Sequence, residues 1–324
     1  MIPIPFNRPV ISDSEYLAVM EVMNQDWLTE GPRTAEFEKE LERYLGGGTH
    51  VCVVNSGSSA LMCALLASGF KPGDEVVVPA ITHIATLTAP YILGARIKIV
   101  DVELDTFNMP PNDWPTADFV IPVDVAGLPC RLNTDATVIM DSAQSFGSSY
   151  LGYKIRRTHC FSFQMTKQLT TIEGGCIASR DEEVIERCRR IKNYGRTKEQ
   201  YVHDIIGTNW RTTEINSAIG LEQLKYIDDV IDRRKAVNRM YRAKLDPRFI
   251  KFPTYSSDQS PMFCFVMVDD GRAPKVLNDL RKVGIDARRI WLPLQLQPIV
   301  HNNRRIECDY FPNSIQIYEN TISL

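Results

Sequence analysis

Long apolar runs, a bias of charge and a leader-like start are all missing from this 324-residue sequence. No stretch approaches the ~18 consecutive apolar residues that a membrane-spanning helix requires, and residues 1–9 show no basic segment followed by a long apolar one. The 37 basic and 40 acidic residues give a net charge of -3, and no basic tail or block of like charge offers nucleic acid an electrostatic footprint. We therefore expect a cytoplasmic protein that binds neither membranes nor nucleic acid.

Paired cysteines and a dinucleotide-binding fingerprint are also absent. The eight cysteines are scattered, with no CxxC pair and no tight Cys/His cluster at metal-ligand spacing. We therefore expect reduced cysteines in the core and no metal site. No GxGxxG follows the first predicted strand, which argues against a nicotinamide-dependent dehydrogenase.

Short apolar, β-rich runs alternate with helical patterns along most of the chain. The length permits one large domain and a smaller one. The order of strand, turn and helix from residue 50 onward is typical of a mainly parallel α/β sheet. Its predicted strands cover residues 50–54, 75–78, 97–101, 119–122, 138–141, 160–163 and 176–179. We predict a large α/β domain over 1–244 and a small, apparently shortened C-terminal α+β domain over 245–324.

Helix signals are clearest at the start of the chain and in its second half. Ser12 and Glu15 form a capping box, which predicts a helix, and Thr34 is expected to cap a second one. A long helical stretch at 213–244 contains a possible break at 226–228. The apolar residues that follow the capping box at helical spacing are Tyr16, Leu17, Met20 and Met23.

A lysine and an aspartate form the most informative pair in the sequence. Lys167 lies six residues before the run Glu-Gly-Gly at 173–175, and Asp141, 26 residues upstream, closes the apolar strand 137–141. Pyridoxal phosphate requires a lysine that holds it as a Schiff base and an acid that keeps its ring nitrogen protonated. Taken separately, the lysine is more often a solvated loop charge, and the aspartate is in some cases a helix cap. Together they predict a site for this cofactor at the carboxyl edge of the sheet.

Four further groups are expected near this pair. The run Asn-Ser-Gly-Ser-Ser-Ala at 55–60 lies between a strand and a helix, where free N–H groups attract an anion such as the cofactor phosphate, although a serine-rich helix cap has the same pattern. Ser162 offers the phosphate another hydroxyl. His83 follows the strand 75–78 and presents a ring that can stack on pyridoxal, or it has a structural role. Gln144 either binds the cofactor's phenolic oxygen or caps the next helix.

Eight segments give the sequence a specific resemblance to a known family. In order, they are VVNSGSSAL, GDEVVVPAITHIAT, PVDVAGLPC, MDSAQSFG, FSFQMTKQLTTIEGG, RRIKNYG, GTNWRTTEINSAIGLEQL and YENTISL. The chain resembles the DegT/DnrJ/EryC1/StrS family of pyridoxal phosphate-dependent nucleotide-sugar aminotransferases over roughly residues 8–324. The resemblance implies the aspartate aminotransferase-like fold, known as fold type I, and a homodimer with shared active sites.

The resemblance also implies an activity and residue roles. Members transfer an amino group, usually from glutamate, to a nucleotide-linked keto-sugar, often a 4-keto-6-deoxyhexose, for amino-sugar biosynthesis such as that of lipopolysaccharide O-antigens. The implied roles are Lys167 as the Schiff-base lysine, Asp141 as the pyridine partner, Gln144 as the contact to the ring oxygen, His83 as the stacking residue, Gly57, Ser58 and Ser162 as phosphate ligands, and Asn209 as a phosphate ligand from the neighbouring subunit. Without the resemblance, Asn209 is an ordinary residue of a polar turn.

Two positions depart from the family pattern, and three alternatives stay open. Gln295 and Asp124 stand where a histidine is frequent, so the sugar is not identified by the sequence. A cluster of basic residues offers a diphosphate contact or, for most of its members, only a solvated helix face: Arg189, Arg190, Lys192 and Arg196. The competing function is a non-catalytic, cofactor-binding regulator or scaffold of the same fold. A sugar dehydratase of this family carries histidine in place of the lysine, and Lys167 argues against that branch.

Overall fold

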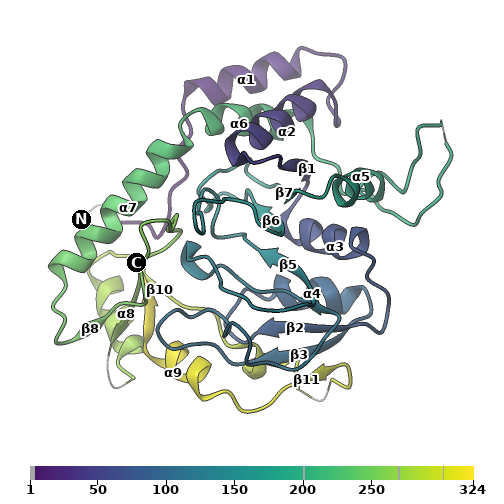
Figure 1. The fold of residues 1–324 in the computed structure, drawn as a ribbon. Coiled ribbons are helices and arrows are strands. Elements are labelled where there is room, and N and C mark those ends of the chain that lie inside the picture. The colour runs from purple at the N-terminus through teal and green to yellow at the C-terminus, as the bar shows by residue number, and fades with distance from the viewer. Residues whose placement is uncertain (1–3, 200, 269–270, 302) are drawn as a thin grey trace.

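A twisted eight-stranded sheet forms the centre of the computed structural model, which describes residues 4–199, 201–268, 271–301 and 303–324 (Figure 1). The strand order is β1-β7-β6-β5-β4-β2-β3-β11, and only β7 runs antiparallel to its neighbours. The strands are β1 (His50–Val54), β2 (Glu75–Pro79), β3 (Arg96–Val100), β4 (Phe119–Val120), β5 (Thr137–Asp141), β6 (Thr158–Ser162), β7 (Gly175–Ser179) and β11 (Ile306–Glu307). The predicted mainly parallel α/β architecture is confirmed.

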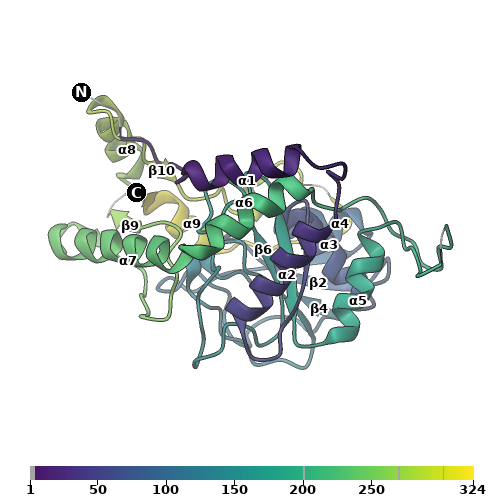
Figure 2. The same cartoon turned by 90° about the horizontal axis from the view of Figure 1, so that it is seen from above.

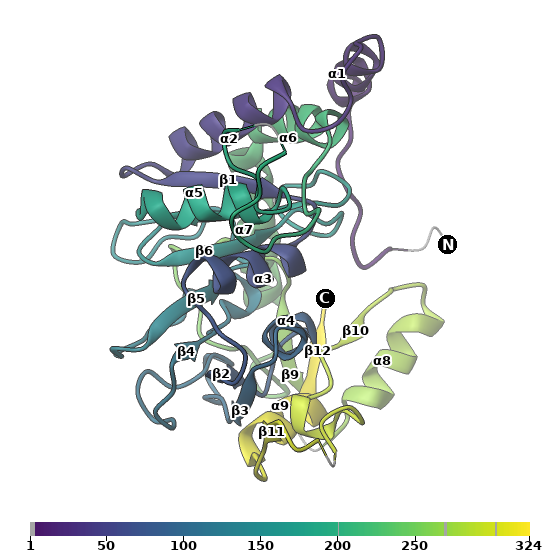
Figure 3. The ribbon, with the colours of Figure 1, turned by 90° about the vertical axis from the view of Figure 1, so that its right-hand side faces the viewer.

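Helices cover both faces of this sheet (Figures 1 and 3). Successive side chains of a strand point to opposite faces, and β1 illustrates the result: Cys52 and Val54 pack in the core under α3, whereas Val51 and Val53 pack on the α2 side. The helices of this part of the chain are α1 (Asp13–Met23), α2 (Pro32–Leu45), α3 (Gly57–Ala67), α4 (Ala85–Ile92), α5 (Glu182–Ile191), α6 (Glu214–Lys225) and α7 (Ile227–Lys244). The possible break at 226–228 is confirmed at Tyr226, which separates α6 from α7.

A second, four-stranded antiparallel sheet lies beside α7 and is called the C-terminal sheet below (Figure 3). Its order is β10-β12-β9-β8, and α8 and α9 accompany it. The bounds are β8 (Ile250–Lys251), β9 (Phe265–Val268), α8 (Ala273–Lys282), β10 (Arg288–Arg289), α9 (Pro312–Asn320) and β12 (Thr321–Ser323). The division at residue 244 stays a prediction. One strand of the large sheet, β11, comes from the C-terminal part of the chain.

The start of α2 differs from the sequence-based expectation. The helix begins at Pro32 with Gly31 as N-cap, so Thr34 is not the cap. Glu214 takes this role from another helix, because its carboxylate accepts hydrogen bonds from the backbone N–H groups of Gly31, Arg33 and Thr34 at 2.7–2.9 Å and from the Thr34 hydroxyl at 2.8 Å. A buried carboxylate at a helix N-terminus satisfies the unpaired N–H groups and favours the helix dipole. Local sequence did not contain this partner.

The first helix forms as predicted, but most of its large apolar side chains are exposed to solvent. Ser12 and Glu15 form the capping box of α1, which packs along α6 (Figure 2). The exposed large apolar residues of α1 and the turn after it are Tyr16, Leu17, Met20, Met23, Trp27 and Leu28. An apolar surface of this kind commonly marks a site of protein association.

The expectation of reduced cysteines in the core agrees with the fold. All eight cysteines are unpaired, and seven of them are buried. Among the described residues, no helix combines the length and the apolar character needed to cross a bilayer.

Candidate active site

The carboxyl ends of neighbouring parallel strands place Asp141 at one edge of the large sheet. Asp141 is the last residue of β5, and its side chain is buried, with 5% of its surface exposed. Its two carboxylate oxygens accept hydrogen bonds from the Thr86 hydroxyl at 2.7 Å and from the backbone N–H of Ala143 at 3.2 Å. Thr86 belongs to α4, which follows β2 at the same edge. The aspartate is thus held in one orientation by two donors, one from helix α4 and one from the turn after β5.

Lys167 lies in a tight turn that follows β6. Its backbone N–H donates to the carbonyl of Gln164 at 2.9 Å, and the Gln164 side chain accepts from the N–H and hydroxyl of Thr166. Burial lowers the pKa of the Lys167 amine to about 8; the charge of Asp141 opposes this effect, and that of Arg234 adds to it. The turn therefore presents a partly buried amine that gives up its proton more easily than an exposed lysine does.

His83, Asp141 and Lys167 share one electrostatic environment. Burial lowers the pKa of His83, and the positive charge of Lys167 lowers it further, while Asp141 raises it. Burial raises the pKa of Asp141, against the opposing effects of Thr86, the Ala143 N–H, Lys167 and His83. Thr86 joins two of these groups, because its N–H donates to the His83 carbonyl at 3.1 Å and its hydroxyl donates to Asp141. The side chain of His83 remains exposed, and its Nδ1 accepts a hydrogen bond from the Ala85 N–H at 3.2 Å.

The turn between β1 and α3 supplies a helix N-terminus next to this cluster. Gly57 and Ser58 are the first two residues of α3, and the Ser56 hydroxyl caps it by accepting from the Ser59 N–H. A Cβ on Gly57 would lie 2.9 Å from the Cβ of Ser162, so glycine allows Ser162 to approach the turn closely. The arrangement brings the helix N-terminus and the Ser162 hydroxyl to one place, as expected for an anion site.

Gly175 keeps the same turn against the sheet, a role that was not apparent in the sequence. A Cβ on Gly175 would lie 2.8 Å from the backbone nitrogen of Gly57 and 2.7 Å from the carbonyl carbon of Ser56. Larger residues would therefore displace the turn. The run Glu-Gly-Gly after Lys167 was a recognisable signal, but its contact partner, more than 100 residues upstream, was not.

Gln144 is buried close to Asp141, but it does not cap a helix. The described residues between β5 and β6 form turns, so the cap alternative is wrong. The Gln144 side-chain oxygen accepts from the Ala126 N–H at 3.0 Å, and its backbone carbonyl accepts from the Gln168 side chain at 2.6 Å. These bonds fix its position beside the end of β5. The contact from Gln144 to a cofactor stays a prediction.

Asn209 lies in the exposed loop before α6. Its neighbour Trp210 accepts a hydrogen bond from the backbone N–H of Asn55 at 3.0 Å, which ties this loop to the β1–α3 turn of the same chain. The Asn209 side chain accepts from the Arg211 N–H at 3.3 Å. Just before this loop, residues 194–199 and 201–206 project away from the rest of the chain (Figures 1 and 2). The side chain of Asn209 is exposed, and its contact with a neighbouring subunit stays a prediction.

The basic cluster on α5 is largely engaged in ion pairs. Lys192 is 1% exposed and pairs with Glu30 at 3.1 Å and Glu38 at 3.2 Å, and it also donates to the Val53 carbonyl. The prediction of a solvated face is therefore wrong for Lys192. Arg189 and Arg190 pair with nearby acids. These ion pairs connect α5 and Lys192 to α2 and to Asp204, and a diphosphate contact from the cluster stays a prediction.

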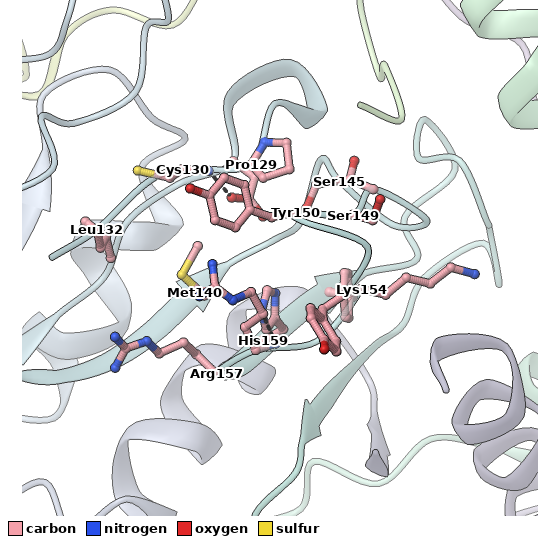
Figure 4. Close-up of a pocket in the computed structure, with 15 residues that line it drawn as sticks. Pro129, Cys130, Leu132, Met140, Ser145, Ser149, Tyr150, Lys154, Arg157 and His159 are labelled. Atoms are coloured by element: carbon pink, nitrogen blue, oxygen red, sulfur yellow. Dashed lines mark hydrogen bonds between the residues drawn. The ribbon is translucent and has the colours of Figure 1, made fainter. Parts of the chain in front are cut away.

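A separate cavity of about 70 Å³ lies near Asp124 and His159 (Figure 4). Its lining includes Met140, whose side chain points to the opposite face of β5 from Asp141 because neighbours on a strand alternate. Burial raises the pKa of Asp124 to about 6, and its carboxylate accepts from Ser142, Ser145 and the Cys130 N–H. Neither Lys167 nor His83 lines the cavity, so it is distinct from the cluster described above.

Comparisons with known proteins agree with this geometry. The model of the DegT/DnrJ/EryC1/StrS aminotransferase family matches residues 9–324. The GDP-perosamine synthase of Caulobacter vibrioides is 31% identical over 316 residues, which cover 90% of this chain and 85% of that protein. Among solved structures, S. venezuelae DesV is 27% identical with a TM-score of 0.88, covering 96% of this chain and 88% of that one.

Spr1654 from Streptococcus pneumoniae, solved in its PLP form, is 25% identical with a TM-score of 0.90, covering 99% of this chain and 93% of that one. The match to the family model extends over nearly the whole chain and includes every residue of the cluster around Lys167. The chain belongs to the DegT/DnrJ/EryC1/StrS aminotransferase family, and it is a pyridoxal phosphate-dependent sugar aminotransferase of fold type I.

Proposed function

We propose that this enzyme transfers an amino group from an amino acid, L-glutamate, to the carbonyl carbon of a nucleotide-linked keto-sugar, a 4-keto-6-deoxyhexose. The observation that carries the proposal is the convergence of the Lys167 amine, the buried Asp141 carboxylate and the β1–α3 turn at one edge of the sheet. The similarity to a GDP-perosamine synthase supports a nucleotide-linked sugar as acceptor. The product belongs to amino-sugar biosynthesis, and an O-antigen sugar is one such product.

The residues present fit pyridoxal phosphate. The close approaches at Gly57 and Gly175 hold the N-terminus of α3 against Ser162 and the sheet, because a Cβ on either glycine would collide with these neighbours. The phosphate group would bind the N-terminus of α3 through Gly57 and Ser58 and the hydroxyl of Ser162. Asp141 would hold the pyridine nitrogen, His83 would stack on the ring, and Gln144 would bind the phenolic oxygen.

Each residue has a defined task in the proposed reaction. When bound, pyridoxal phosphate supplies an electron sink for the bonds of the donor's α-carbon. Lys167 anchors the cofactor and, once released, moves a proton between the donor α-carbon and the cofactor C4′. Asp141 would hold a proton on the pyridine nitrogen, and the Thr86 and Ala143 donors orient its carboxylate and favour its ionised form against the effect of burial. After the keto acid leaves, the same groups serve the sugar in the reverse direction.

We further propose a homodimer in which Asn209 of one chain contacts the phosphate bound by the other. The support is the uncovered apolar surface of α1, together with the exposed position of the Asn209 loop. A second copy of the chain would remove Leu17, Met20 and Met23 from water, which favours association.

Two experiments test the function. A mass-spectrometric screen of GDP-, UDP- and dTDP-linked keto-sugars with glutamate is expected to yield one aminated product. We expect Lys167→Ala to abolish both this product and the visible absorption band of lysine-bound pyridoxal phosphate, because the anchoring amine is lost. Substantial transamination by this variant would refute the assignment. A wild-type protein that binds the cofactor but does not react with any amino donor would support the regulator instead.

A further inference from the structure

A single arginine joins the turn that carries Lys167 to a distant segment of the chain. Arg234 projects from α7, and its Nη1 donates to the Met262 carbonyl at 2.9 Å. Its Nη2 donates to the carbonyls of Lys167 at 3.0 Å and Thr166 at 3.3 Å. Met262 lies three residues before β9, so one guanidinium holds the Lys167 turn and the segment that enters the C-terminal sheet.

The environment of Arg234 is unusual for a charged group. Burial lowers the pKa of its guanidinium to about 10. Among the described residues Arg234 forms no ion pair, and its hydrogen-bond partners there are the three carbonyl oxygens. A partly buried cation without an ion pair loses some of its hydration, so these carbonyls contribute to its stabilisation. The planar fork of arginine can reach two segments at once, which a lysine ammonium on a flexible stem does poorly.

Further hydrogen bonds connect segment 259–262 to residues close to Lys167 and Asp141 in the chain. The Gln168 side chain donates to the Ser260 carbonyl at 2.8 Å and to the Gln144 carbonyl at 2.6 Å. The Ser260 N–H donates to the Ser148 hydroxyl at 2.8 Å, and the Gln259 side chain donates to the Ala126 carbonyl at 2.8 Å. These hydrogen bonds attach segment 259–262 to Gln168, which directly follows Lys167, and to Ser148 and Ala126. Arg234 attaches the same segment to α7.

We propose that Arg234 is a positioning residue that locks the Lys167 turn and the segment 259–262 into one unit, so that the active-site lysine keeps its place relative to the C-terminal sheet. The role of Lys167 in the reaction rests on the proposed function, but the mechanical connection does not.

Arg234 also contributes to the charge around the Lys167 amine. The groups that face this amine are Asp141 at the end of β5, Glu173 before β7, His83 before α4 and Arg234 on α7. The two carboxylates favour the protonated amine, and Arg234 opposes it. Burial of the turn has the largest effect and lowers the pKa of Lys167. Loss of Arg234 would release the turn to water and remove a positive charge, so both consequences raise the pKa of the amine.

Hydrogen exchange on the purified full-length enzyme tests the connection. In Arg234→Met and Arg234→Lys we expect amide exchange in residues 163–168 and 259–264 to accelerate together by roughly tenfold or more, the change that loss of one charge-assisted hydrogen bond produces. Arg239→Met, an exposed position on the same helix, is the matched control and should exchange as the wild type does. Unchanged exchange in Arg234→Lys, or acceleration in only one of the two segments, would overturn the proposal. If Arg234→Met does not fold, Arg234→Lys alone decides.

The pH dependence of Lys167 labelling in the cofactor-free chain gives a second readout that a purely structural effect elsewhere would not move. The labelling midpoint should rise in Arg234→Met, which loses both the connection and the charge, should rise less in Arg234→Lys, which keeps the charge, and should stay at the wild-type value in Arg239→Met. Wild-type midpoints in both folded variants would contradict the proposal. Neither readout uses a sugar, an amino donor or bound cofactor, so a failure of the proposed function would leave both results interpretable.

Discussion

The lowered pKa of Lys167 leads to a quantitative prediction about its reactivity. Only the unprotonated amine can attack a carbonyl carbon. At pH 7, an amine with a pKa of about 8 is about 9% unprotonated, whereas one at the ordinary value of 10.5 is about 0.03% unprotonated, a difference of about 300-fold. We therefore expect Lys167 to react far faster at neutral pH than an exposed lysine does, and to reach a plateau above about pH 9.

Competitive labelling measures this difference directly. The cofactor-free chain is pulsed with a trace of acetic anhydride between pH 6 and 11, and the extent of labelling at Lys167 is read by mass spectrometry after digestion. Exposed Lys39 in the same digests supplies the reference curve. A curve for Lys167 that follows that of Lys39 would refute the reasoning, because it would show that burial does not act on this amine.

The variant Asp141→Asn tests the direction in which a neighbouring charge shifts the pKa of Lys167. The negative charge of Asp141 favours the protonated amine. Its removal should therefore lower the pH at the labelling midpoint of Lys167 by roughly one pH unit, as expected for a close charge pair. This shift is opposite to the one expected for Arg234→Met. An upward shift in Asp141→Asn would indicate that the two side chains do not face each other.

Three further changes test the turn, the helix cap and the apolar surface. Gly57→Ala should weaken pyridoxal phosphate binding at least about tenfold in a spectroscopic titration, since its Cβ meets Ser162; an unchanged dissociation constant would contradict the anion site. Glu214→Ala should lower the free energy of unfolding by about 3–5 kcal/mol in urea, because four donors lose their partner, whereas Glu222→Ala, which removes a surface ion pair, should change it by under about 1 kcal/mol. Met20→Glu should shift the chain toward the monomer in analytical ultracentrifugation; a dimer of unchanged stability would exclude α1 from the interface.

Elements with strong local patterns were predictable from the sequence. The capping box at Ser12 and the break at Tyr226 lie where the local signals indicate, because hydrogen bonds and side-chain periodicity within a few residues decide them. The start of α2 was mispredicted because Glu214, 180 residues away, supplies the capping carboxylate. The burial of Lys192 was missed for the same reason, since its partners Glu30 and Glu38 belong to another part of the chain.

For the candidate site too, some features follow from the sequence and others only from the tertiary structure. The sequence alone determined that Asp141 ends a buried strand and that Lys167 and the glycine-serine turn follow other strands of the sheet, and parallel strands bring their carboxyl ends to one edge. Only the tertiary structure decided which groups contact them. Thr86 donates a hydrogen bond to Asp141, Gly175 lies close to the glycine-serine turn, and Arg234 donates a hydrogen bond to the Lys167 carbonyl. These contacts join residues far apart in the chain, and they depend on the strand order and on the path of α7, which local periodicity does not encode.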